Sequence, residues 1–130
     1  MNIVLVVDDT WELRELFMET LSDAGYEVHG AANGLEALNA LDSLEGKPCV
    51  VLLDMMMPVM DGRAVCDALR ANGGLPPVVV MTAADHVAQC ARDVGAVGWL
   101  AKPFEIDELV AAIKGVLDDM KGEAAKLTPA

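Results

Sequence analysis

Apolar and polar positions follow each other along the chain in blocks of two kinds. Short, nearly unbroken apolar runs predict buried strands, and longer stretches with an apolar residue every three or four positions predict amphipathic helices. Strands are expected over 2–7, 26–32, 49–54, 77–82 and 97–102. Helices are expected over 10–25, about 34–44, 61–74, roughly 85–94 and about 105–120. In the second helix, the apolar positions are Leu35, Leu38, Leu41 and Leu44.

The alternation of five strands with five helices indicates the fold class. Strands that are apolar at almost every position belong to a parallel sheet with helices on both faces. Right-handed crossovers then predict a doubly wound α/β fold. The length of 130 residues suits one domain, which we place at 1–120. Residues 121–130 show no apolar periodicity and are expected to form a short disordered tail.

Charge and composition narrow the class of function. The chain has 21 acidic and nine basic residues, a formal charge of −12, which argues against direct binding to nucleic acid. No apolar run approaches the ~18 residues that span a bilayer, and no signal peptide is visible, so we expect a cytoplasmic protein without membrane contact. The odd set Cys49, Cys66 and Cys90 suits buried free thiols in a reducing compartment.

Reactive side chains stand where the predicted strands end. Asp8 and Asp9 follow the first strand, Asp54 ends the third, Thr82 ends the fourth and Lys102 ends the fifth. In an open parallel sheet the carboxyl ends of the strands meet at one edge, where ligands bind. A carboxylate directly after the apolar run "CVVLL" is therefore explained by a functional site rather than by a misplaced surface charge.

Three carboxylates at one edge repel each other unless a cation joins them. Oxygen ligands with room for water suit Mg²⁺, or Mn²⁺ as an alternative, better than zinc. Lys102 would add one further positive charge. Any single one of these carboxylates could simply cap a helix, but the whole set at one edge favours a functional site.

Four motifs carry a resemblance to a known family. "VVDD", "LLDMMMPVMDG", "VVVMTA" and "LAKPF" occur in this order at family-like spacing. Over about residues 2–120 the chain resembles the CheY-like receiver domain of two-component response regulators. This resemblance implies a flavodoxin-like sheet with strand order 2-1-3-4-5.

The resemblance also implies roles for the acidic residues. Asp54 would accept a phosphoryl group from a histidine kinase or a phosphotransfer protein. Asp8, Asp9 and Asp54 would hold Mg²⁺, together with the backbone carbonyl of Met56. The domain would then be a signalling phosphoacceptor rather than an enzyme, with only self-catalysed transfer and autodephosphorylation.

Further positions would stabilise the phosphoryl group and pass the signal on. Thr82 would hydrogen-bond one phosphoryl oxygen and Lys102 would pair with another, with a cis bond before Pro103. Trp99 stands where the family has a switch aromatic; it could also be a half-buried packing residue on an edge strand. The surface of the fourth helix, fifth strand and fifth helix would bind a downstream protein or a fused output domain, or form a dimer.

Three other functions remain as alternatives. A flavin-binding module would need a phosphate-cradling loop after the first strand, where this chain has the acidic "DDTWE". A phosphatase of the haloacid dehalogenase type would need a second aspartate at the position of Thr10. A degenerate receiver would act as an interaction module without phosphorylation.

Overall fold

The computed structural model describes residues 2–44, 47, 49–57, 60–71, 73–83 and 85–127. Within these ranges the strands are β1 (Ile3–Val7), β2 (Glu27–Ala31), β3 (Cys49–Asp54), β4 (Val78–Ala83) and β5 (Gly98–Lys102). The helices are α1 (Trp11–Asp23), α2 (Gly34–Ser43), α3 (Gly62–Ala71), α4 (Val87–Val94) and α5 (Ile106–Leu127). All pairings are parallel and the strand order is β2-β1-β3-β4-β5. The predicted doubly wound fold is confirmed.

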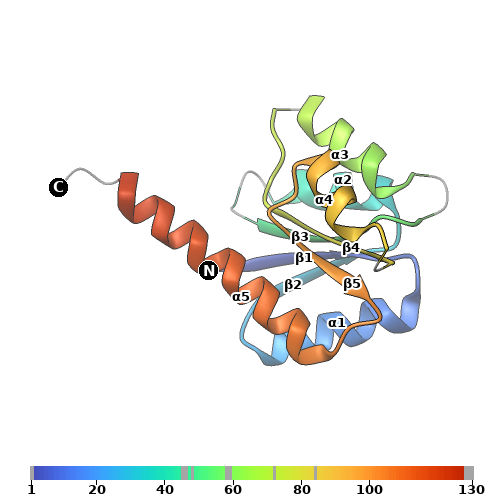
Figure 1. Ribbon diagram of the computed structural model, residues 1–130, viewed down its shortest axis with the longest axis horizontal. Coiled ribbons are helices and arrows are strands. Elements are labelled where there is room, and N and C mark those ends of the chain that lie inside the picture. The colour runs from blue at the N-terminus through green and yellow to red at the C-terminus, as the bar shows by residue number, and fades with distance from the viewer. Residues whose placement is uncertain are drawn as a thin grey trace.

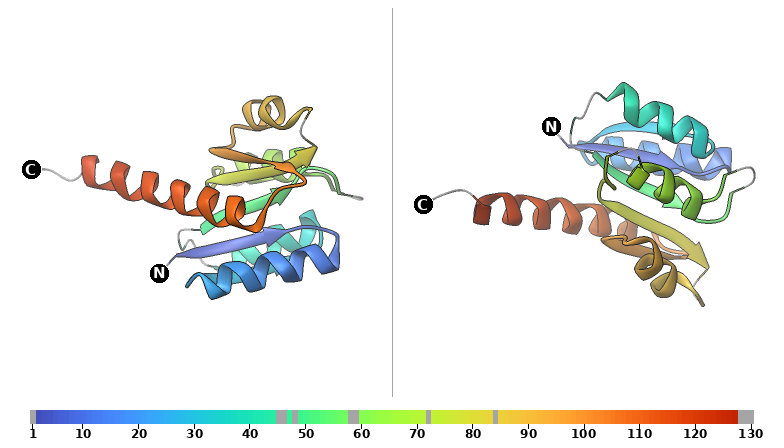
Figure 2. Two further views of the ribbon diagram at one scale, coloured as in Figure 1. Left: turned by 60° about the horizontal axis from the view of Figure 1, so that its bottom comes forward. Right: turned by 90° about the horizontal axis from the view of Figure 1, so that it is seen from above.

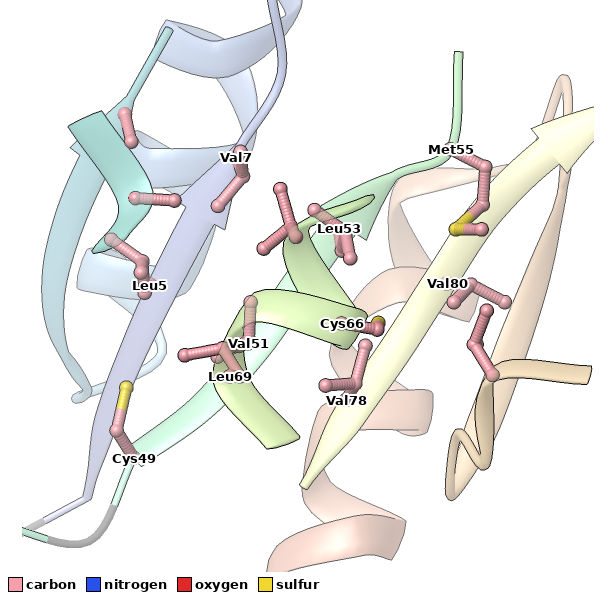
Figure 3. Packing of buried hydrophobic residues seen from close by; sticks show 14 of the residues in the cluster. Leu5, Val7, Cys49, Val51, Leu53, Met55, Cys66, Leu69, Val78 and Val80 are labelled. Atoms are coloured by element: carbon pink, nitrogen blue, oxygen red, sulfur yellow. The ribbon is translucent and has the colours of Figure 1, made fainter. Parts of the chain in front are cut away.

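Helices cover the sheet on both faces (Figures 1 and 2). α1 and α5 lie on one face, where Phe17, Leu21, Leu109 and Ile113 pack against alternate residues of the central strands. α2, α3 and α4 lie on the other face. Figure 3 shows this second core, in which residues of α3 pack against the central strands, among them Cys66 and Leu69 over Val51, Leu53, Val78 and Val80.

The alternation of side chains along the strands decides where the polar groups point. Asp54 continues the positions of β3 that face α1 and α5, after Leu52. Lys102 continues the same face of β5 after Leu100, and Asp8 does so beyond the end of β1. The three charged side chains therefore leave the sheet on the face of α1 and α5, at the carboxyl edge.

Helix α2 differs from the pattern that predicted it. Leu35 was expected on the buried face, yet it is 57 % exposed, and Ala37 is buried instead. Residues spaced three apart drift backwards around a helix, because each step turns ~300° rather than a full circle. Leu35 and Leu44 are nine positions apart and so lie on opposite sides of the helix, with Leu44 buried.

Helix α5 also extends further than expected. It continues to Leu127 and projects beyond the rest of the fold (Figure 1), whereas the sequence pattern predicted an end at Met120 and a disordered tail. The segment 121–127 is rich in Ala, Glu, Lys and Leu, which favour helix even without an apolar face to bury. Residues 128–130 of the expected tail lie outside the described ranges. Among the described helices, none is long and apolar enough to cross a membrane.

Candidate functional site

Three carboxylates converge at the carboxyl edge of the sheet. One oxygen each from Asp8, Asp9 and Asp54 lies within 4.8 Å of the others. The register explains this proximity, because β1 and β3 are neighbours in which Val7 pairs with Leu53, directly before Asp8 and Asp54. Asp8 and Asp54 are buried, and Asp9 is exposed. The cluster is thus walled by protein on one side and open to solvent on the other.

Lys102 reaches this cluster from a distant strand. Its Nζ lies 3.3 Å from Asp8 Oδ2 and 3.5 Å from Asp54 Oδ2. β4 separates β5 from β3, so only a long side chain can bring a positive charge from β5 to these carboxylates. The peptide bond between Lys102 and Pro103 is cis, as the resemblance implied.

Asp8 is held by four groups from different parts of the chain. Its N–H donates to the carbonyl of Ala31 at 3.2 Å, and its carbonyl accepts from Arg14 Nη1 at 2.8 Å. The N–H of Thr10 donates to Oδ1 at 2.9 Å, and Lys102 donates to Oδ2. Sequence reasoning did not single out Arg14. The only sign of its role in the sequence was its position: Arg14 is a basic residue about one turn into the helix that follows the acidic pair Asp8-Asp9.

Asp54 has fewer partners and is almost completely buried, with 4 % of its surface exposed. The N–H of Met56 donates to Asp54 Oδ1 at 3.0 Å. Burial raises the pKa of the Asp54 carboxyl above its ordinary value; the Met56 N–H and the charge of Lys102 oppose this shift, and the charge of Asp8 adds to it. The ionised form is therefore costly, so a cation beside Asp54 would be bound favourably.

The loop after β3 folds back on itself at Gly62. The N–H of Gly62 donates to the carbonyl of Met55 at 3.3 Å. A Cβ at Gly62 would stand 2.9 Å from the Cα of Met55, which is too close, and 3.1 Å from the carbonyl oxygen of Asp54, which is tighter than most such contacts. A residue with a side chain would therefore push the segment that carries the candidate phosphoacceptor. The Asp-Gly pair at 61–62 was the only sign of this contact in the sequence.

Thr82 and Trp99 project from the other face of the sheet than Asp54 and Lys102. Thr82 is buried near the end of β4, and no hydrogen bond joins it to the acidic residues within the described ranges. In the register, Thr82 pairs with Ala101 and Val80 with Trp99, so Thr82 and Trp99 project on the same face of the sheet, that of α2, α3 and α4. Trp99 is 50 % exposed. The structure thus places Thr82 at the edge and Trp99 further down the strand.

An apolar cavity opens beside the charged site. It measures about 470 Å³ and lies between α1 and the segment after β5, with Lys102 in its wall. Leu13, Leu16 and Phe17 line it from α1, and Phe104 closes it, stacked on Phe17 at a centroid distance of 5.4 Å. We call this cavity the α1 groove. At the start of α1, Trp11 is also exposed.

The fold and this edge together define a receiver domain. The chain matches the model of the family "Response regulator receiver domain" over residues 4–114, and it belongs to this family. The predicted family and fold are thereby confirmed.

Two curated relatives from mycobacteria are longer than this chain. The chain is 42 % identical to "Response regulator MprA" of Mycolicibacterium vanbaalenii, over 96 % of this chain and 56 % of that protein. It is 41 % identical to the protein of the same name from Mycobacterium tuberculosis, over 94 % of this chain and 53 % of the relative. The chain therefore spans about half the length of these relatives.

Solved structures agree with the fold. The chemotaxis response regulator CheY4 of Vibrio cholerae superposes with a TM-score of 0.73 at 37 % identity, covering 85 % of this chain and 94 % of that one. NtrX of Brucella abortus, crystallised with ATP, gives a TM-score of 0.82 at 30 % identity. That match covers 98 % of this chain but 30 % of NtrX.

Proposed function

We propose that this domain takes a phosphoryl group onto Asp54 and uses it to switch a protein surface. The observation that carries the proposal is the setting of Asp54: a buried carboxylate that lies close to two further carboxylates and 3.5 Å from the Lys102 ammonium. Such a setting favours a reaction that brings in both a metal ion and an anionic phosphoryl group.

The donor set fits Mg²⁺. All candidate side-chain ligands are carboxylate oxygens, and the exposure of Asp9 leaves room for the water ligands that Mg²⁺ retains. Asp8 and Asp9 would hold the ion with Asp54, and the carbonyl of Met56 would be a further ligand; Mn²⁺ has the same preferences. When bound, the ion supplies positive charge to the phosphoryl oxygens. Without it, three carboxylates would repel that group.

The chain's own residues position the transfer. A carboxylate oxygen of Asp54 attacks the phosphorus of a phosphohistidine, the new O–P bond forms and the N–P bond to the donor imidazole breaks. Lys102 pairs with one phosphoryl oxygen, and the Thr82 hydroxyl donates to another. Because a carboxylate is a modest nucleophile, the rate depends on this positioning and charge neutralisation. The later hydrolysis of the acyl phosphate, also self-catalysed, resets the domain.

The α1 groove provides a docking surface for the phosphoryl donor. It combines exposed apolar side chains of α1 with a wall formed by Lys102, so a bound partner would lie next to Asp54. We propose that a histidine kinase or a phosphotransfer protein inserts apolar side chains here. Buried free thiols at Cys49 and Cys66 agree with a reducing, cytoplasmic setting for this encounter.

The signal leaves on the face of Thr82 and Trp99. A phosphoryl group on Asp54 draws the Thr82 hydroxyl toward it, and Trp99 on the same face fills the space that is vacated. This repacks α4, β5 and α5, where Val97 and Trp99 expose apolar surface for a downstream protein, a fused output domain or a second copy. The domain itself need not contact nucleic acid.

Phosphorylation of Asp54 can be tested with a small-molecule donor. Acetyl phosphate with Mg²⁺ should add one acid-labile phosphoryl group, measured by intact-protein mass spectrometry. Asp54→Asn should abolish it, and Asp61→Asn is the matched control because Asp61 lies in the same loop and caps α3 through Ala64 N–H. Equal labelling of Asp54→Asn and wild type would place the acceptor elsewhere. If wild type takes no label and binds no Mg²⁺, the domain is instead a phosphorylation-independent interaction module.

A further inference from the structure

We infer that Arg14 is a positioning residue for the metal-binding loop, and that it raises the affinity for Mg²⁺ although its own charge is positive. This inference rests on the proposed function, because it concerns the same acidic cluster. Arg14 does not touch a carboxylate within the described residues; it donates from Nη1 to the backbone carbonyl of Asp8 at 2.8 Å.

The contact completes the set of bonds around Asp8. The N–H, the carbonyl and both carboxylate oxygens of Asp8 each have a partner, and Arg14 supplies the one for the carbonyl. Asp8 is fully buried, so water cannot replace a lost partner without a shift of the loop. Because Asp9 follows directly and is exposed, the backbone of Asp8 decides where the Asp9 carboxylate lies.

The packing of α1 against β2 makes this reach possible. A Cβ at Gly30 would stand 2.6 Å from Met18 Sδ and 3.5 Å from Arg14 Cδ. Gly30 pairs with Val6 of β1 and lies next to Ala31, whose carbonyl accepts from Asp8. The absence of a side chain at position 30 therefore lets Met18 lie close to the sheet, and the stem of Arg14 passes beside it at ordinary contact distance, next to the loop that Arg14 holds.

Two physical effects of Arg14 predict changes of opposite sign in the Mg²⁺ affinity when Arg14 is replaced. Coulomb repulsion between the guanidinium and a divalent cation would make the site weaker, so its removal would raise the Mg²⁺ affinity. Positioning of the loop would make the site stronger, so its removal would lower the affinity. The sign of the change in affinity separates these effects without any assumption about their size.

Calorimetric titration with Mg²⁺ tests the sign. We expect Arg14→Met to bind about tenfold more weakly than wild type, which is the effect of one lost charge-assisted hydrogen bond. Arg14→Lys keeps the charge and one donor and should bind more tightly than Arg14→Met. The control is Arg92→Met, which removes the same charge from α4, where Arg92 contacts Gln89. An affinity of Arg14→Met equal to or above that of wild type overturns the inference.

Amide hydrogen exchange without metal gives an independent readout. Exchange in residues 8–10 should be faster in Arg14→Met than in wild type and unchanged in Arg92→Met. Equal exchange in all three proteins would overturn the inference, whether or not wild type binds Mg²⁺. Failure of wild type to bind Mg²⁺ would instead count against the proposed function. If Arg14→Met does not fold, Arg14→Gln serves in both measurements, because it removes the guanidinium but keeps a polar side chain on α1. Wild-type affinity and exchange in that variant would overturn the inference.

Discussion

The loop after β1 and the loop after β3 deliver their carboxylates to the same point by different means. In the first loop, side chains from distant elements add to the backbone bonds: Arg14 from α1 and Lys102 from β5 both donate to Asp8. In the second loop, a close backbone contact adds to the ion pair with Lys102, since Gly62 approaches Met55 and Asp54 more closely than a side chain would permit. The first arrangement depends on the charged side chains of Arg14 and Lys102. The second depends on the absence of a Cβ at Gly62.

This difference has a consequence for how each loop tolerates change. A bond between side chain and backbone can be weakened in steps, by replacing arginine with lysine or methionine. A contact at 2.9 Å between a new Cβ and a backbone Cα cannot be relieved by a rotamer change, so the backbone itself must move. The candidate metal site should therefore respond gradually to substitutions around Asp8 and abruptly to a side chain at Gly62.

The largest effect is expected from removing a charge at the exposed end of the first loop. Asp9→Asn should weaken Mg²⁺ binding about 100-fold, because one of three anionic ligands is lost from a site for a hard cation. Calorimetry measures the change, and Glu12→Gln is the control, since it neutralises an exposed carboxylate in the first turn of α1. Similar losses in both variants would mean that general charge, rather than ligation by Asp9, governs binding.

Gly62→Ala tests the steric arrangement of the second loop. We expect Mg²⁺ affinity and the rate of phosphorylation by acetyl phosphate to fall about tenfold, with a loss of roughly 1–3 kcal/mol in the free energy of unfolding from overpacking. Gly34→Ala is the matched control, because the atoms nearest to its Cβ would belong to the side chains of Met60 and Val65 rather than to backbone. It should lose stability but keep its Mg²⁺ affinity. If both variants keep wild-type affinity, the close approach of Gly62 does not position Asp54.

Thr82→Ala tests whether the face that carries Thr82 and Trp99 responds to phosphorylation through the Thr82 hydroxyl, separately from the two acidic loops. The variant should still accept phosphate, about tenfold more slowly through loss of one hydrogen bond to the phosphoryl group. In a Trp11→Phe background, the fluorescence of Trp99 should change with beryllofluoride and Mg²⁺ when Thr82 is present and stay constant in Thr82→Ala. A full response without the hydroxyl would make Trp99 a packing residue that is not coupled to Thr82.

The smallest effect distinguishes the two buried carboxylates by the sign of a stability change. In metal-free buffer, Asp54→Asn should raise the free energy of unfolding by on the order of 1 kcal/mol at neutral pH, because it removes a desolvated charge. Asp8→Asn should lower the free energy of unfolding, because Lys102 loses its closer carboxylate partner, at 3.3 Å. Urea denaturation measures both changes. Changes of the same sign would show that the carboxylates of Asp8 and Asp54 affect the stability of the fold in the same way.

The pH dependence of the Asp54→Asn effect follows from the raised pKa. Burial raises the pKa of Asp54 in the folded state, so the folded chain binds this proton more tightly than the unfolded chain does. Ionisation then costs stability as the pH rises through the folded pKa. The advantage of Asp54→Asn should be present at neutral pH and disappear as the pH falls to about 4, near the ordinary aspartate value. A constant advantage over this range would exclude ionisation of Asp54 as its cause.

Much of the fold, and the gathering of Asp8, Asp9 and Asp54 at one edge of the sheet, could be predicted from the sequence. Strands buried on both faces, such as "IVLVV" and "CVVLLD", read as solid apolar runs, and a sheet of parallel strands brings their carboxyl ends to one edge. Asp8, Asp9, Asp54, Thr82 and Lys102 each stand at such an end, and the resemblance to receivers rests on the same positions. These features depend on local pattern and on topology, which a linear sequence expresses directly.

Only the tertiary structure decided which groups hold this site in place. The bond from Arg14 to a backbone carbonyl and the approach of Gly62 to Met55 require that separate segments are placed to within a few tenths of an ångström. The exposure of Leu35 depended on how α2 is rotated against the sheet. Such features follow from the relative placement of whole elements, and one residue pattern is compatible with several placements.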